Sequence, residues 1–355
     1  MSSTPAVSVV IPLYNAEKYI GACLTSILNQ TFQDFEIIVV DDCSTDSSCT
    51  VVESFMPKFG ERLKLLRTEK NSGGAGVPSN IGIENARGKY LYVMDDDDLI
   101  LDATLETLYK SAEDFQADVV FMERGYFFES EEGKIVPDEK NLKLQAWLGK
   151  IDYLVEEPEL ENETEALIES FLQIEIGWPV WQKFFLRDFV TENKITFPDL
   201  PTSQDWIFTL QLISYAKRFL RIPYPLYVYR KNNSDSVCRT ARSKDDELIF
   251  WIKTHLEGVK FLTNFFDSQN FFKSNLRYQQ QLLEMWEKTN YNNVMKLMAD
   301  MTPDEMYNIL KNAMAEKFDD NASLIAYLCT SVTAYKFKWT VEKFKNEIME
   351  QNHPT

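Results

Sequence analysis

Short apolar runs alternate with segments of helical periodicity through residues 5–125. The runs are rich in Val, Ile and Leu, as buried strands are. They predict five strands, at 7–13, 36–40, 63–66, 89–94 and 118–122. The segments between them carry apolar residues on one helix face, for example at positions 20, 23, 24, 27 and 28. We therefore expect strands and helices in strict alternation.

This alternation predicts parallel βαβ units with right-handed crossovers. The predicted fold class is α/β, with a doubly wound, mostly parallel sheet and helices on both faces. Ligands of such sheets bind at the carboxyl ends of the strands. Four polar sequences follow strands in this way and should meet at one edge, namely 12–15, 41–42, 71–74 and 95–98.

After residue 125 the chain loses the regular alternation of apolar runs and helical segments. Residues 129–165 are acidic and poorly periodic, which indicates an insertion. Ordered patterns return at 178–240, and from about residue 245 the sequence predicts a mainly helical C-terminal extension. We divide the chain into three expected parts, at 1–125, 126–240 and 241–355.

Composition narrows the functional classes. The chain has 355 residues and a formal net charge of −18, which argues against nucleic acid as a partner. It contains five cysteines without a Cys-x-x-Cys pair and two histidines, so a structural zinc site is not expected. We find no apolar run near the length of about 18 residues that a membrane span needs, and no signal peptide. These features predict a cytoplasmic protein, with a place at the inner face of the membrane as the alternative.

The sharpest chemical signal is the run Asp95-Asp96-Asp97-Asp98 after the fourth predicted strand. Adjacent carboxylates repel one another, and a cation removes that cost. In an extended backbone Asp95 and Asp97 point the same way and can reach one ion. Hard oxygen ligands suit Mg²⁺ or Mn²⁺, which also bind substrate phosphates. The alternative is a solvated acidic loop; the position at the ligand edge favours the metal.

Two further strand ends are ambiguous on their own. Asp41-Asp42 can accept hydrogen bonds from a nucleobase or ribose, or can cap the next helix. The glycine-rich segment Asn71 to Gly76 lets a ligand approach the backbone closely, but a plain turn explains it equally well. It matches neither a P-loop nor a dinucleotide fingerprint, which excludes an oxidoreductase of that type.

Taken together, these segments resemble the family 2 glycosyltransferases, which have a GT-A fold. The resemblance covers residues 5–125 closely. It is carried by Val-Ser-Val-Val-Ile-Pro-Leu-Tyr-Asn from residue 7, Val-Asp-Asp-Cys-Ser-Thr-Asp from residue 40, Asn-Ser-Gly-Gly from residue 71 and Val-Met-Asp-Asp-Asp-Asp from residue 93. A weaker match continues at 181–185, 204–208 and 227–230, similar to bacterial members that assemble polysaccharide and lipopolysaccharide.

The resemblance implies a role for each matching residue. Asp205 would be the general base, and Asp95 and Asp97 would hold the metal, Mn²⁺ or Mg²⁺. The nucleotide-sugar would be bound by Pro12, Tyr14, Glu17, Asp41, Asp42, Asn71, Gly73, Asp95 and Asp96. Support for the acceptor or diphosphate would come from Lys183, Trp181 and Arg230. In this view residues 1–125 bind the nucleotide-sugar, and 126–240 form the acceptor side.

The implied reaction is inverting transfer of a sugar from a nucleotide-sugar, first of all a UDP-sugar, to a hydroxyl of a glycan or lipid-linked acceptor. Two departures from the family pattern bear on it. Pro78-Ser79 replaces the usual Ala-Arg, which puts the donor preference in doubt, and Gln204 replaces the usual glutamate before Asp205. The alternative functions are a sugar-phosphate nucleotidyltransferase and a non-catalytic carbohydrate-binding or scaffold protein. For Asp205 the alternative role is a helix cap.

The C-terminal region leaves two questions open. The alternating aromatic and basic residues Tyr335–Trp339 are typical of a packed helix end or strand, with peripheral membrane contact as the alternative. The aromatic-rich C-terminal helices could also form the interface of a homo-oligomer.

Overall fold

The computed structural model describes residues 4–129, 142–146, 155–231 and 242–299, with single positions 301, 302, 305 and 309. Much of the acidic stretch 129–165 and the aromatic and basic run Tyr335–Trp339 therefore lie outside the described residues. The chain forms two compact units. The first contains Met1–Ala241 and Phe265–Met285, and the second contains Arg242–Asn264 and Trp286–Thr355.

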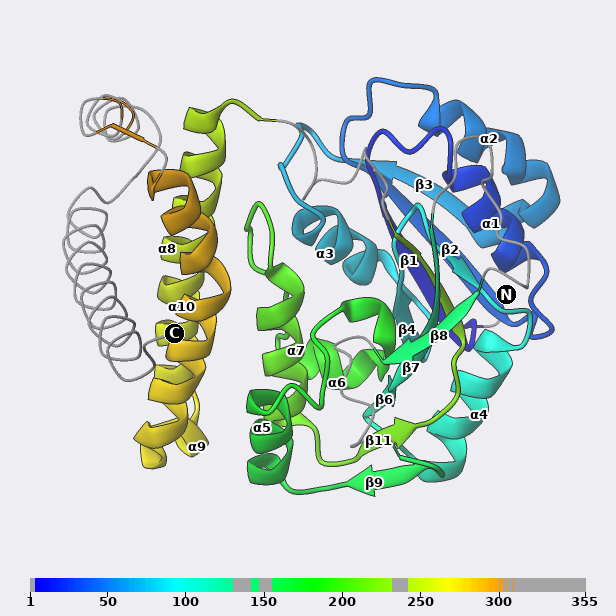
Figure 1. The fold of residues 1–355 in the computed structure, drawn as a ribbon. Helices are drawn as coiled ribbons and strands as arrows, with labels where there is room; N and C mark the ends of the chain where they lie inside the picture. Colours follow the sequence, from blue (N-terminus) through cyan, green and yellow to red (C-terminus); the bar gives the residue numbers. More distant parts are fainter. Residues whose placement is uncertain are drawn as a thin grey trace, which may run out of the picture. The chain divides into compact units, whose positions relative to one another are not determined.

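The first unit is built on an eight-stranded sheet in the order β3-β2-β1-β4-β10-β6-β11-β9 (Figure 1). The strands are β1 (Val7–Leu13), β2 (Phe35–Asp41), β3 (Leu63–Arg67), β4 (Tyr90–Val93), β6 (Val119–Met122), β9 (Glu159–Glu161), β10 (Lys183–Leu186) and β11 (Phe219–Ile222). β3, β2, β1 and β4 are parallel neighbours, as are β6 and β11. The expected mostly parallel sheet is confirmed.

The five strands predicted from apolar runs are β1, β2, β3, β4 and β6. One central strand was not predicted: β10 lies antiparallel between β4 and β6. Its first residue, Lys183, consequently lies at the edge where β4 ends. This insertion brings a segment from the middle of the chain to the edge where we expected the ligand.

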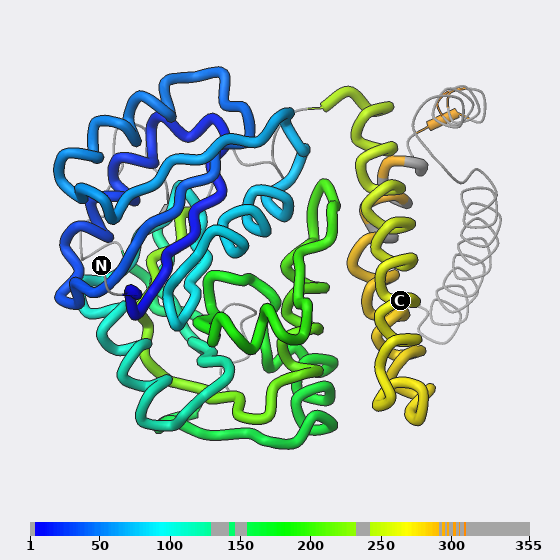
Figure 2. The backbone as a smooth tube through the Cα atoms, turned by 180° about the vertical axis from the view of Figure 1, so that it is seen from behind, coloured from blue at the N-terminus to red at the C-terminus, as the bar shows by residue number. Residues whose placement is uncertain are grey.

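Helices cover both faces of this sheet. Val9 and Ile11 of β1 share a core with α1 (Ile20–Leu28), α2 (Ser48–Phe59) and α4 (Thr104–Phe115). Their neighbour Val10 points the other way, toward Gly82 of α3 (Gly76–Asn85). On that second face, Phe208 of α7 (Gln204–Tyr215) packs against Phe185. α1 and α2 lie side by side, in blue (Figure 1, Figure 2).

A second sheet of four strands has the order β5-β12-β7-β8. Its strands are β5 (Leu99–Ile100), β7 (Arg124–Glu129), β8 (Lys143–Ala146) and β12 (Tyr227–Lys231). β4 of the large sheet and β5 of the small one are joined by Met94 and Asp95–Asp98, and we call Asp95–Asp98 the aspartate loop. The acidic run therefore connects the two sheets and is held at both ends.

Shorter elements complete the first unit. They are η1 (Gly60–Arg62), α5 (Thr164–Leu172), η4 (Val180–Gln182), α6 (Arg187–Glu192) and α9 (Asn270–Ser274). The described part of the second unit is helical, as predicted, and contains most of α8 (Lys244–Ser268) and the end of α10 (Leu276–Ala299). In it the Trp286 indole N–H donates to the carbonyl of His255 at 3.3 Å. None of the helices within the described ranges is both long enough and apolar enough to cross a bilayer.

Replacing Gly82 by alanine tests the contact between α3 and β1. A Cβ at this position would lie 2.3 Å from Cγ1 of the fully buried Val10. We expect Gly82→Ala to lower the free energy of unfolding by about 1–3 kcal/mol, the usual cost of overpacking. Gly21→Ala is the matched control, since its Cβ would lie 3.5 Å from Val51. That change should be neutral or stabilising by roughly 0.5–1 kcal/mol in the same urea titration.

Candidate active site

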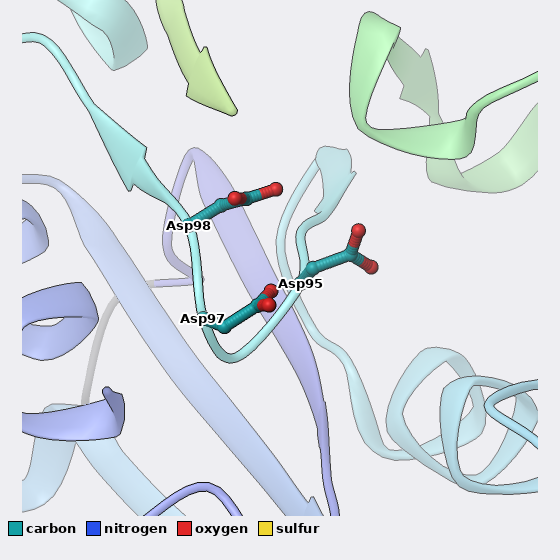
Figure 3. A group of neighbouring side chains, drawn as sticks. All are labelled: Asp95, Asp97 and Asp98. Carbon is teal, nitrogen blue, oxygen red and sulfur yellow. The ribbon is translucent and has the colours of Figure 1, made fainter. Parts of the chain in front are cut away.

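The aspartate loop gathers three carboxylates at the end of β4. Asp96 and Asp97 form a turn, and the Asp98 N–H faces the Asp95 carbonyl at 3.5 Å. Carboxylate oxygens of Asp95, Asp97 and Asp98 lie within 4.8 Å of one another (Figure 3). The extended backbone predicted here from the sequence is wrong. The turn brings Asp95 and Asp97 together instead, and adds Asp98 to the group.

The electrostatics of this group fit a divalent cation. Burial, and then the charges of Asp97 and Asp205, raise the pKa of Asp95 well above its usual value. Burial and the charge of Asp97 do the same to the pKa of Asp98. Carboxylates in such surroundings resist ionisation unless positive charge is supplied. An oxygen-only donor set is the one that Mg²⁺ and Mn²⁺ prefer.

The three carboxylates are not equivalent. Asp98 is fully buried, and both of its oxygens accept hydrogen bonds from β12. The Arg230 backbone N–H donates to Oδ1 at 2.6 Å, and the Tyr227 hydroxyl donates to Oδ2 at 2.8 Å. Asp95 and Asp97 are half-buried. The arrangement therefore favours the two aspartates predicted as metal ligands over Asp98.

Asp96 points to a different neighbour. Its Oδ2 accepts a hydrogen bond of 3.0 Å from the backbone N–H of Tyr14, the residue that follows β1. The Tyr14 side chain is 42% exposed, which leaves an aromatic ring available at the carboxyl edge of the sheet. The contact ties the end of β1 to the aspartate loop, so two of the four predicted polar strand ends do meet.

Asp205, the predicted base, lies in the first turn of α7. Its Oδ2 accepts the Val180 N–H at 3.0 Å, a contact outside its own helix. Burial raises its pKa to about 6, although the Val180 N–H and the nearby Lys183 act to lower it. Its charge in turn raises the pKa of Asp95. The structure thus brings Asp205 next to the aspartate loop, more than a hundred residues away in sequence.

The three residues predicted to support the acceptor or diphosphate are buried. The Lys183 ammonium donates to the carbonyls of Gly177 and Pro179, and burial lowers its pKa well below the usual value. Trp181 stacks on Tyr227 with ring centroids 4.3 Å apart. These contacts are with the chain itself, so any support from Lys183 or Trp181 would act through the shape of the site.

Arg230 is 2% exposed and is also held by the chain. Its guanidinium lies 4.7 Å from the ring centroids of both Tyr19 and Phe128. Its Nε donates to the carbonyl of Asp97 at 2.8 Å. This buried arginine therefore contacts the backbone of the aspartate loop.

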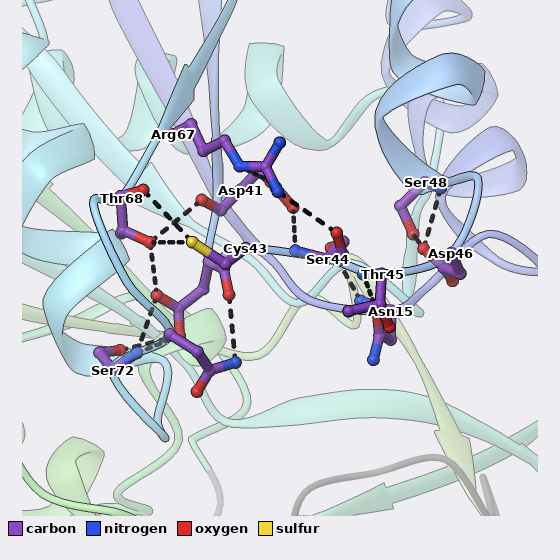
Figure 4. A network of polar contacts seen from close by, with 12 residues as sticks. Asn15, Asp41, Cys43, Ser44, Thr45, Asp46, Ser48, Arg67, Thr68 and Ser72 are labelled. Carbon is purple, nitrogen blue, oxygen red and sulfur yellow. Dashed lines mark hydrogen bonds and ion pairs between the residues drawn. The ribbon is translucent and has the colours of Figure 1, made fainter.

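Asp41 and Asp42 lie in a network that holds two loops (Figure 4). Oδ1 of Asp41 accepts the Ser44 N–H at 3.0 Å, and Oδ2 pairs with the Arg67 guanidinium at 3.2 Å. Asp42 accepts hydrogen bonds from the Thr68 hydroxyl and from the backbone N–H and hydroxyl of Ser72, at 2.8–2.9 Å. Both side chains are buried. Direct contact of either carboxylate with a nucleobase stays a prediction.

The glycine-rich segment is fixed by the same network. The Asn71 amide donates to the Asp42 carbonyl at 3.1 Å, and Oδ1 of Asn71 accepts the Gly73 N–H at 2.8 Å. Gly73 has φ +82°, which favours glycine. A Cβ at Gly74 would lie 2.4 Å from the Leu200 carbonyl oxygen. Close packing onto the segment before α7 is therefore one reason for glycine here.

A second contact joins the same two segments. The Asn80 amide, in α3, exchanges two hydrogen bonds with the backbone of Phe197, at 2.8 and 2.9 Å. Asn80 is the residue after Pro78-Ser79, where the chain departs from the family pattern. The departure therefore leaves intact the tie between α3 and the segment that leads to Asp205.

The remaining predicted nucleotide-sugar residues lie at the end of β1. Pro12 is buried within β1, opposite Val40. Glu17 is exposed, and its Oε2 accepts the Ser47 N–H at 2.8 Å. Glu17 also borders a cavity of about 530 Å³ between α1 and the strands β5 and β12, lined further by Leu99 and Val228. Neither the aspartate loop nor Asp205 lines this cavity.

Comparison with protein-family models decides what kind of domain carries these groups. Residues 8–166 match the model described as Glycosyl transferase family 2. These residues form a family 2 glycosyltransferase domain. The predicted resemblance is confirmed, and the fold is the GT-A fold. The matched residues include all of β1 but Val7, together with β2, β4 and the whole aspartate loop.

Relatives and solved structures agree with this assignment. The sequence is 32% identical to poly(ribitol-phosphate) beta-glucosyltransferase of Bacillus spizizenii over 233 residues. This match covers 64% of the present chain but only 33% of the length of that relative. The crystal structure of S. aureus TarS 1-349 in complex with UDP-GlcNAc superimposes with a TM-score of 0.61 at 23% identity, covering 87% of this chain and 80% of that one.

A second solved structure is the mannosyltransferase PcManGT from Pyrobaculum calidifontis in complex with GDP-Man and Mn²⁺. Its TM-score is 0.50 at 17% identity, and the match covers 96% of this chain and 84% of that one. At these identities the two structures establish the shared fold of the glycosyltransferase domain.

Several groups around the site were not singled out from the sequence. They are the hydroxyl of Tyr227 and the backbone N–H groups of Val180 and Arg230. No local pattern marks them, because each acts on a partner far away in the sequence. The Tyr227 hydroxyl, for example, reaches an aspartate 129 positions away.

Lys183→Met tests the buried lysine beneath Asp205. Methionine fills similar volume but leaves the carbonyls of Gly177 and Pro179 without their donor. We expect the free energy of unfolding to fall by about 2–4 kcal/mol, since each orphaned buried polar group costs roughly 1–3 kcal/mol. Lys110→Met, at an exposed position of α4, should change it by less than about 0.5 kcal/mol. Equal urea midpoints for the two variants would contradict the assignment.

Proposed function

We propose that this chain is a metal-dependent, inverting glycosyltransferase of surface polysaccharide synthesis. It transfers a sugar from a nucleotide-sugar, first of all a UDP-sugar, to a hydroxyl of a glycan or lipid-linked acceptor. The proposal is carried by the group of Asp95, Asp97 and Asp98 in a family 2 glycosyltransferase domain, with Asp205 near enough for its charge to raise the pKa of Asp95. A group able to bind cations and a group able to accept a proton thus share one edge of the sheet.

Asp95 and Asp97 are the residues that would hold the divalent ion. Their half-buried carboxylates, next to a fully engaged Asp98, offer two oxygen donors in a region that otherwise resists ionisation. When bound, such an ion neutralises the charge of a departing diphosphate. PcManGT, which shares the fold, was solved with GDP-Man and Mn²⁺, and this supports the assignment.

Asp205 is the residue that would accept the proton of the acceptor hydroxyl. The acceptor oxygen forms a bond to the anomeric carbon as the bond to the diphosphate breaks, and the diphosphate leaves with the electron pair. The hydroxyl proton goes to the Asp205 carboxylate. The Val180 N–H fixes one carboxylate oxygen at 3.0 Å. A single displacement of this kind inverts the configuration at the anomeric carbon.

The donor class is supported by the relatives. TarS, which has the same fold, was solved with UDP-GlcNAc, and the Bacillus spizizenii relative is a glucosyltransferase acting on poly(ribitol-phosphate). In this chain the exposed ring of Tyr14 lies where β1 ends, next to the aspartate loop. An aromatic ring in this place suits a nucleoside, since it offers a flat apolar surface.

Asp97→Asn tests the metal role. The amide keeps the size of the side chain but removes the charge of one carboxylate donor. We expect the dissociation constant for Mn²⁺ to rise by about tenfold to a hundredfold, measured from the electron paramagnetic resonance of free Mn²⁺. Asp114→Asn, an exposed position in α4, is the charge-matched control and should bind Mn²⁺ as the wild type does. Equal affinity in all three proteins would exclude the aspartate loop as the site.

Asp205→Asn tests the base. Transfer to an acceptor should fall by at least about a hundredfold, while Mn²⁺-dependent binding of the donor persists.

In the wild type a base with a pKa of about 6 is ionised above that pH. The value of kcat/KM should therefore fall about tenfold for each pH unit below 6, and level off above it.

A panel of nucleotide-sugars, assayed for binding and for slow hydrolysis with and without Mn²⁺, supplies the donor for these experiments. It also separates the proposed enzyme from the non-catalytic alternative. An active transferase should hydrolyse its donor slowly in a manner that needs Mn²⁺ and Asp205. Binding without any turnover, unchanged in Asp205→Asn, would favour a carbohydrate-binding protein on the same fold.

A further inference from the structure

The hydroxyl of Tyr227 lies inside the turn of the aspartate loop. It donates to Oδ2 of Asp98 at 2.8 Å and accepts the backbone N–H of Asp95 at 3.3 Å. One oxygen atom thus joins the first and the last residue of the loop. The side chain is fully buried, so water does not compete strongly for either hydrogen bond.

The ring that carries this hydroxyl has little freedom. It stacks on the buried indole of Trp181 with centroids 4.3 Å apart and an angle of 7° between the planes. The backbone of Tyr227 is paired with Ile100 of β5, two residues beyond the loop. The hydroxyl is therefore held in place by contacts of its residue with η4 and with β5.

β12 contacts the loop at a second point, three residues further on. The Arg230 backbone N–H donates to Oδ1 of Asp98, and its Nε donates to the Asp97 carbonyl. Together, Tyr227 and Arg230 hold the backbone of Asp95 and Asp97 and the carboxylate of Asp98. The carboxylates of Asp95 and Asp97 are half-buried, and their oxygens lie within 4.8 Å of each other.

We propose that Tyr227 is a positioning residue whose hydroxyl closes the aspartate loop and sets the separation of the Asp95 and Asp97 carboxylates for a divalent cation. In this arrangement Asp98 is an internal support for the loop and not a ligand. The inference rests on the proposed function, since it assumes that the loop holds the cation. Tyr227 itself contacts neither ion nor substrate.

The physical reason for such a residue is repulsion. Three carboxylates with oxygens within 4.8 Å favour any backbone change that separates them. A loop free to open would hold Asp95 and Asp97 too far apart, and the ion would have to supply the free energy of closing it. Neighbours that orient metal ligands typically change metal affinity or activity by 10–100-fold when they are removed.

The test is Tyr227→Phe in the full chain, with Tyr92→Phe as the matched control. Phenylalanine keeps the stacking on Trp181 and removes one oxygen atom. The Tyr92 hydroxyl is also buried near these carboxylates, but has no hydrogen-bond partner among the described residues. We expect the Mn²⁺ dissociation constant to rise about tenfold in Tyr227→Phe and to stay within twofold of the wild type in Tyr92→Phe.

The dependence of the transfer rate on Mn²⁺ concentration provides a second test. If Tyr227 positions the ligands, the Mn²⁺ concentration for half-maximal rate rises in Tyr227→Phe, and saturating Mn²⁺ restores kcat to within about threefold. A general loss of structure would lower kcat at every Mn²⁺ concentration. Asp98→Asn provides a separate check that does not depend on Tyr227: it should weaken Mn²⁺ binding less than Asp97→Asn does.

The failures are distinguishable. Wild-type protein that binds no Mn²⁺ overturns the metal role in the proposed function, and this inference with it. Wild-type binding that is matched by Tyr227→Phe overturns the inference alone. An effect of Asp98→Asn equal to that of Asp97→Asn contradicts the support role of Asp98.

Discussion

Repulsion among the carboxylates of the aspartate loop is the force that the surrounding structure has to balance. Three of them meet at the end of β4 with oxygens within 4.8 Å, and Asp205 adds a fourth negative charge nearby. Hydrogen bonds fix these carboxylates in place. The contacts from β12, from the Tyr14 N–H and from the Val180 N–H all serve that purpose. Under the proposed function, a divalent cation would meet ligands that are already assembled.

The sequence was sufficient to predict the parts of the site that follow strands in the chain. Continuous apolar runs such as Val7–Leu13 mark buried parallel strands, and the polar residues after them must lie at one edge. The small sheet and β10 could not be predicted in this way. β10 pairs Phe184 with Tyr92, a partner that no local periodicity identifies, and Asp98 finds its partner Tyr227 only in the folded chain.

Local patterns also do not show which way a side chain points. For this reason the motif resemblance led us to expect Lys183, Trp181 and Arg230 in contact with the ligand. Motif resemblance places them near the site, and they are near it. It does not say on which side of the backbone they lie. In the structure these side chains are buried and contact the chain's own carbonyls and rings. Large polar groups beneath a site fix its shape, and a resemblance alone does not separate that role from contact with a ligand.

Asn80 and the glycines before it have a consequence for how this enzyme can vary. Through Asn80, Gly74 and Gly76, the loop on the donor side rests against the backbone of residues 197–200, which leads directly into the helix of Asp205. A change that reshapes residues 71–80 therefore also acts on the segment that precedes Asp205. If the proposed function holds, donor choice and acceptor chemistry are mechanically linked, and hybrids that exchange donor specificity should exchange both segments together.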